Sequence, residues 1–93
     1  MLDSVKQYIT KLIVSLDNGI VIESEVLYGE SKLEYSLCKD NLMASISVLS
    51  DYTYDFFIVE IKSENTRTNK TKKFTNFDDL LAEIKVDILE FAN

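Results

Sequence analysis

The sequence predicts an α+β domain: an antiparallel sheet of four to five strands in meander order, with an N-terminal and a C-terminal helix packed on one face. Apolar residues recur every three or four positions near both ends of the chain and alternate with polar residues in between. The connections between the alternating segments are short, which favours antiparallel pairing of neighbouring strands. Because the chain has 93 residues and no internal repeat, residues 1–93 are interpreted as one domain.

The first segment is predicted to be a helix because its apolar residues share one stripe. These residues are Val5, Tyr8, Ile9, Leu12 and Leu16. Ser4 and Gln7 have the spacing of a capping box, so we expect the helix to begin near Asp3 or Ser4. The run "DNG" at residues 17–19 is expected to end it, because Asn and Gly tolerate the left-handed conformation that closes a helix.

The hydrophobic period changes to two from Ile20, which predicts half-buried strands. The first, residues 20–28, is expected to place Glu23 and Glu25 on one face and the apolar residues Ile20, Ile22, Val26 and Tyr28 on the other. Residues 32–38 and 42–49 repeat the alternation. Their core-facing residues are predicted to be Leu33, Tyr35, Leu37, Leu42, Ala44, Ile46 and Val48.

The fourth strand, expected over residues 52–63, carries apolar residues on both faces. One register turns Tyr52, Tyr54, Phe56 and Ile58 outward, and the other exposes Phe57, Val59 and Ile61. Either register leaves apolar surface that two helices on one sheet face do not cover, unless long side chains or chain ends cover it. We therefore expect a docking surface on this strand.

The last third of the chain is predicted to contain a polar loop, a short strand and a helix. Residues 64–71 read as the loop, in which a basic run forms a solvated hairpin tip, and residues 72–75 as a short fifth strand. The helix has the stripe Phe77, Leu80, Leu81, Ile84, Ile88 and Phe91. Thr75 or Asn76 is expected to cap it, and Asp87 is expected on its polar side.

Composition argues against several function classes. The net charge of −6 opposes binding to nucleic acid and to anionic membranes. There is no histidine, Cys38 is the single cysteine and only two glycines occur, so we expect no enzymatic activity, no metal and no cofactor. Glu23 and Glu25 are interpreted as the solvent side of a strand rather than as a metal or acid–base pair. No apolar run approaches the roughly 20 residues of a membrane span, which predicts a cytoplasmic protein.

The order of segments resembles a known family. The run "SKLEYSLCKDNLMASISVLSDYTYDFFIVEIKSENTRTNKTKKFTNFDDLLAEIKVDILEF", residues 31–91, is similar to the TriTu-type immunity proteins of bacterial polymorphic toxin systems. The resemblance covers a charged hairpin, the strand "ASISVL", an acidic and aromatic corner, a long strand and a closing helix. It implies a small, non-catalytic protein that neutralises a cognate toxin by binding it.

The expected contact residues combine carboxylates, which would meet a basic toxin, with tyrosines that hold the complex. We place Asp51, Tyr52, Tyr54 and Asp55 first on this surface, followed by Glu23, Glu25 and Glu34. Two other interpretations remain open. The chain could be an acidic nucleic-acid mimic that inhibits a DNA-binding protein, or a structural module that associates with its own copy as a homodimer.

Overall fold

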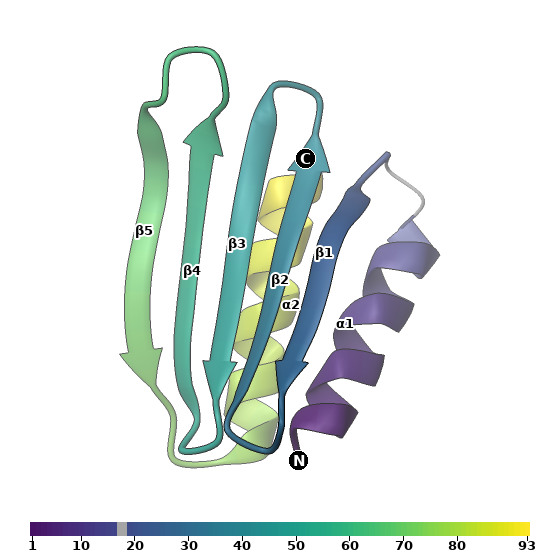
Figure 1. The fold of residues 1–93 in the computed structure, drawn as a ribbon, viewed down its shortest axis with the longest axis vertical. Coiled ribbons are helices and arrows are strands. Elements are labelled where there is room, and N and C mark those ends of the chain that lie inside the picture. Colours follow the sequence, from purple (N-terminus) through teal and green to yellow (C-terminus); the bar gives the residue numbers. More distant parts are fainter. Residues whose placement is uncertain (17–18) are drawn as a thin grey trace.

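The computed structural model describes residues 1–16 and 19–93 (Figure 1). The expected end of the first helix at residues 17–19 falls partly outside these residues. The elements, in chain order, are α1 (Leu2–Leu16), β1 (Val21–Tyr28), β2 (Lys32–Lys39), β3 (Leu42–Leu49), β4 (Thr53–Glu60), β5 (Thr66–Lys73) and α2 (Phe77–Ala92).

The strands form one antiparallel sheet in the order β1-β2-β3-β4-β5. The helices contact each other, α1 also contacts β2, and α2 also contacts β4. In Figure 1 α2 lies behind the sheet, so the picture looks onto the face that the helices leave uncovered. The predicted α+β fold, with a meander sheet and both helices on one face, is confirmed.

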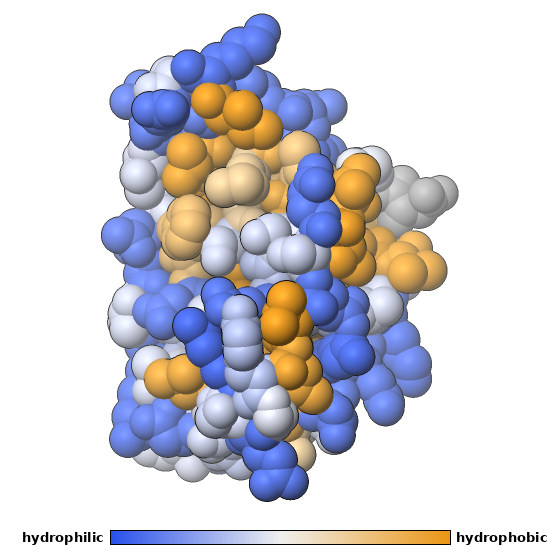
Figure 2. Space-filling view, in the orientation of Figure 1, coloured by the Kyte–Doolittle hydropathy of each residue, from blue (hydrophilic) through white to orange (hydrophobic). Residues whose placement is uncertain are grey.

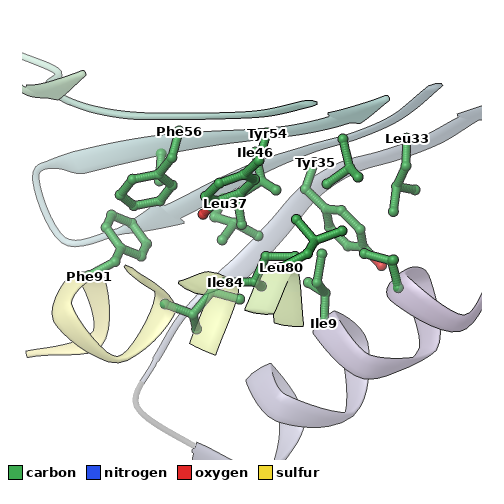
Figure 3. Close-up of a cluster of buried hydrophobic side chains, with 14 of the residues drawn as sticks. Ile9, Leu33, Tyr35, Leu37, Ile46, Tyr54, Phe56, Leu80, Ile84 and Phe91 are labelled. Carbon is green, nitrogen blue, oxygen red and sulfur yellow. The ribbon is translucent and has the colours of Figure 1, made fainter. Parts of the chain in front are cut away.

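The core fills the space between the sheet and the helices (Figure 3). Alternate residues of the three central strands point towards the helices: Leu33, Tyr35, Leu37, Ala44, Ile46, Val48, Tyr54, Phe56 and Ile58. The helices supply Leu2, Val5, Ile9, Ile13, Leu80, Ile84, Ile88 and Phe91. Burial of each larger apolar side chain stabilises the fold by about 1.5–3 kcal/mol. The alternation predicted for residues 32–38 and 42–49 is confirmed, except that Leu42 at the strand end is half-buried.

The register of β4 shows which of its two apolar faces is buried. Tyr54, Phe56 and Ile58 are buried under the helices. Successive side chains of a strand point to opposite faces, so Phe57 and Val59 lie on the uncovered face, where both are half-buried. The strand is also shorter than the expected residues 52–63, because the chain turns after Glu60.

The expectation that Glu23 and Glu25 share a face with each other is wrong because β1 contains a bulge. Ile22 pairs with Leu37 and Ser24 pairs with Ser36, so Glu23 is an extra residue in the ladder. A bulge shifts the alternation by one position. As a result Glu25 lies on the helix side, where it forms an ion pair with Lys6, whereas Val26 and Tyr28 lie on the uncovered face.

The prediction for residues 64–75 is also wrong in its boundaries. Thr66–Lys73 is a full strand, β5, and not a loop followed by a short strand. It lies at the sheet edge, where a strand needs no apolar stripe, and lysines on such an edge discourage pairing with other chains. Its threonines favour extended backbone even though the segment reads as polar.

The helix ends differ in how well they were predicted. Asn76 caps α2, because its side-chain oxygen accepts a hydrogen bond from the backbone N–H of Asp79 at 2.8 Å, as expected. The capping box at Ser4 is wrong: α1 begins at Leu2, and the N–H of Ser4 donates to the carbonyl of Met1 at 3.1 Å.

Candidate protein-binding surface

The uncovered face of the sheet, called here the open face, consists of the side chains that point away from both helices. Cross-strand pairs share a face, so the register of the four ladders defines its rows. One row runs through Val21, Cys38, Met43 and Val59. The next row runs through Ser24, Ser36, Ser45, Phe57 and Asn69, and the third runs through Val26, Glu34, Ser47, Asp55 and Thr71. Beyond the third row, the same face carries Tyr28, Lys32 and Leu49, and the pair Thr53 and Lys73.

The first row and Phe57 form a continuous apolar patch, defined by Val21, Cys38, Met43, Phe57 and Val59. Val21 is 56% exposed and Met43 is 36% exposed, and the other three are half-buried. Figure 2 shows apolar surface gathered over the same half of the sheet, with polar residues around it. Neither helix covers this patch.

The third row carries two carboxylates: Asp55 lies next to Phe57 of the apolar patch, whereas Ser36 separates Glu34 from Cys38. Glu34 forms an ion pair with Lys32 at 3.5 Å, but both side chains are more than a third exposed, so the pair contributes little to stability. Asp55 accepts a hydrogen bond from the hydroxyl of Thr71. Among the described residues, no Lys or Arg lies within ion-pair distance of Asp55.

Asp51 and Tyr52 occupy the β3–β4 turn at the opposite end of the sheet from the apolar patch. Hydrogen bonding by Thr53, whose backbone N–H lies 3.0 Å from the carboxylate of Asp51, lowers the pKa of Asp51, and the charge of Lys73 lowers it further. Tyr52 has φ 70°, a left-handed conformation that is uncommon for a bulky residue. Its ring lies 6.4 Å from that of Phe77 and is half-buried.

A buried polar network joins the sheet to α2 on the other face. The Tyr54 hydroxyl donates a hydrogen bond to Asp87 at 2.8 Å, and Lys70 contacts Asp87 at 2.8 Å and Glu83 at 2.5 Å. Asp87 is only 2% exposed, so its expected place on the polar side of the helix is wrong. Within the described chain, every buried side-chain N or O atom has a hydrogen-bond partner.

Burial and charge shift the pKa values in this network. Burial raises the pKa of Tyr54 far above 10.0, and the negative charge of Asp87 raises it further. Desolvation lowers the pKa of Lys70, but hydrogen bonds to Asp87 and Glu83 outweigh it, so the net pKa is raised. At neutral pH the Tyr54 hydroxyl is therefore a donor and Lys70 is a cation.

The hydroxyl of a second buried tyrosine ties α1 to the sheet. The Tyr35 hydroxyl donates to the Lys6 carbonyl at 3.0 Å and lies 2.8 Å from the hydroxyl of Thr10. Burial raises its pKa to about 12, although the hydrogen bond with Thr10 opposes the shift. Tyr35 and Tyr54 thus share one function in the fold, since each connects a strand to a helix by its polar end.

The structure separates the seven expected contact residues. Glu34 and Asp55 lie together on the open face, whereas Asp51 and Tyr52 occupy a turn, Glu23 lies in the bulge of β1 and Glu25 faces α1. Tyr54 is fully buried and bonded to Asp87, so its expected place on the contact surface is wrong. The apolar patch contains none of the seven.

Residues 1–16 and 19–93 contain no cluster of three or more His, Cys, Asp or Glu side chains arranged to hold a metal ion. No helix among them has both the length and the apolar character needed to cross a membrane. Comparison of the chain with protein-family models, with curated proteins and with solved structures finds no match.

Proposed function

We propose that this chain is a small, non-catalytic immunity protein that acts in the cytoplasm and neutralises a cognate bacterial toxin by direct binding through the open face. The observation that carries the proposal is the apolar patch, which lies on the sheet face that the helices leave uncovered. The resemblance of residues 31–91 to TriTu-type immunity proteins supports the choice of a toxin as the partner.

The open face approaches the size of a standard protein interface. An eight-residue strand is roughly 26 Å long and five paired strands are roughly 24 Å wide, so the face covers roughly 600 Å² before its relief is counted. A standard interface buries about 800 Å² on each partner. A partner that covers this face and a few flanking residues would therefore reach the size of a stable complex.

The chemistry of the open face also fits a protein partner. Met and aromatic residues are enriched in interface centres, and Met43 and Phe57 lie within the apolar patch. Asp55 lies next to Phe57 of this patch and Glu34 lies in the same row as Asp55, and these carboxylates favour a partner with basic residues. Electrostatic complementarity of this kind increases the association rate and suppresses wrong partners.

Nucleic-acid mimicry receives less support from the positions of the carboxylates. A mimic needs a row of negative charges along one surface, whereas Glu25 and Glu34 lie on opposite faces of the sheet. Glu25 is, moreover, paired with Lys6 at 3.2 Å.

The proposal is tested by mixing the purified chain with the toxin domain encoded beside it and measuring binding by calorimetry and toxin activity. We expect a one-to-one complex at micromolar concentrations or below and loss of toxin activity. Binding through apolar contacts should persist at high salt, because salt screens charges and not apolar burial. Absence of a complex, or a complex that dissociates at moderate salt, would count against the proposal.

A further inference from the structure

Glu34 and Asp55 occupy one row of the open face with a single residue, Ser47, between them. Glu34 pairs with Ser47, and Ser47 pairs with Asp55. Because paired strands lie about 4.8 Å apart, the two carboxylates are separated by about 10 Å at the backbone. They therefore form a pair of negative charges across the middle of the sheet, and Asp55 lies next to Phe57 of the apolar patch.

This pair of charges opposes the docking of a second copy of the chain. Two sheets that pack face to face in aligned fashion cross at about 30°. A two-fold axis along β3 would bring β2 over β4 of the other copy, and so Glu34 over the other Asp55. A two-fold axis along the row would instead bring each carboxylate over its own counterpart.

Both symmetric arrangements centred on this row thus place carboxylate against carboxylate. Lys32, 3.5 Å from Glu34, offsets this repulsion only weakly, because both side chains are more than a third exposed. No Lys or Arg of the described chain lies within ion-pair distance of Asp55, and each copy carries a net charge of −6. Like charges brought together in an interface that excludes water are strongly unfavourable. The same two carboxylates would be favourable opposite lysines or arginines.

We propose that Glu34 and Asp55 determine the specificity of the open face: they admit a protein surface with cations opposite both carboxylates, and they exclude a second copy of this chain. The inference rests on the proposed function of the open face as a docking surface. It goes further because it assigns the choice of partner to Glu34 and Asp55, and the strength of binding to the apolar patch.

The first test is self-association of Glu34→Gln/Asp55→Asn, measured by sedimentation equilibrium at low salt. We expect the wild-type chain to be monomeric and the double variant to dimerise at least about tenfold more tightly, the change that 1.4 kcal/mol produces. The control Glu30→Gln/Glu90→Gln removes the same number of charges from exposed positions in a turn and on α2. A wild-type dimer, a monomeric Glu34→Gln/Asp55→Asn variant, or equal dimerisation of the control would overturn the inference.

The second test uses a short amphipathic helical peptide of leucine and arginine and its twin with glutamate in place of arginine. Titration into ¹⁵N-labelled protein should shift amide signals of Ser47, Phe57 and their neighbours with the arginine peptide alone. Glu34→Gln/Asp55→Asn should weaken this binding by about tenfold, whereas the control variant should leave it unchanged. Equal binding of both peptides, or equal loss in both variants, would contradict the inference.

The two proposals fail in different ways. A toxin that binds the open face of the wild-type chain and of Glu34→Gln/Asp55→Asn equally well would remove the role of the carboxylates while leaving the docking function intact. A toxin complex that leaves the open face uncovered would remove the docking function on which the inference rests.

Discussion

Replacement of Lys70 by methionine is expected to lower the free energy of unfolding by about 3 kcal/mol at neutral pH. Lys70 is the cation of the buried network, 2.8 Å from the carboxylate of Asp87. Asp87 is 2% exposed, so without Lys70 a carboxylate would remain in the interior with no counter-ion. The estimate lies at the low end for stranded buried charges, because Lys70 is itself 31% exposed and water would reach part of the vacated space.

The matched control for this prediction is Lys72→Met on the same strand. Lys72 lies over the ring of Phe74 at 5.0 Å but is exposed, so its loss should cost less than about 1 kcal/mol. The triple variant Tyr54→Phe/Lys70→Met/Asp87→Leu should recover most of the stability, because apolar replacement of a whole buried polar group avoids unpaired charge. Urea denaturation would measure all three, and a Lys70→Met cost no greater than that of Lys72→Met would contradict the assignment.

Substitution of Met43 by arginine is expected to weaken toxin binding by at least about 100-fold, equivalent to about 2.8 kcal/mol. Met43 lies within the apolar patch and is partly exposed, so a side chain of similar length is accommodated in the free protein. In the complex, the guanidinium would be buried against apolar atoms and would face a basic partner. Both effects are unfavourable.

The chain offers a matched pair of controls for Met43→Arg. Val21 in the apolar patch and Val86 on α2 are both valines that are 56% exposed. Val21→Arg should weaken binding, whereas Val86→Arg should leave it unchanged. Thermal unfolding of each free variant would establish that the fold is retained, and equal effects of Val21→Arg and Val86→Arg would contradict the placement of the interface on the open face.

The elements with a single buried face could be predicted from the sequence. In β2 and β3 one face is apolar along its length and the other is polar at its centre, so alternation there identifies both the strand and its buried side. The apolar stripe of α2 likewise predicts both the helix and the side of it that packs on the sheet. These features depend on local spacing, which a sequence displays directly.

The features that the sequence does not predict depend on contacts between segments that are distant in the chain. The bulge at Glu23 changes which residues of β1 face α1, yet no residue pattern in residues 20–28 marks it. The sequence predicts Asp87 on the polar side of its helix, because its contacts with Tyr54 and Lys70 come from distant strands. The polar sequence of β5 resembles that of a loop, because an edge strand needs no apolar face.

The sequence predicts that residues 52–61 carry more apolar surface than the core takes up, but it leaves both registers of the strand open. The alternation alone does not show that Phe57 and Val59, and not the tyrosines, lie on the uncovered face. A tyrosine beside aspartates, as Tyr54 is, has a composition typical of interfaces, but the Tyr54 hydroxyl donates a hydrogen bond to Asp87 inside the fold. The clearer signal was Met43, Phe57 and Val59, which take the opposite phase to the core residues of their own strands.

The central claim, that the open face is the docking surface, is tested most directly by the reactivity of Cys38. This single cysteine is half-buried within the apolar patch and reports on the open face without any substitution. The rate of its alkylation by iodoacetamide should fall at least about tenfold in the toxin complex, because the partner excludes solvent from the centre of an interface. An unchanged rate in a fully formed complex would show that the toxin binds elsewhere and would contradict the claim.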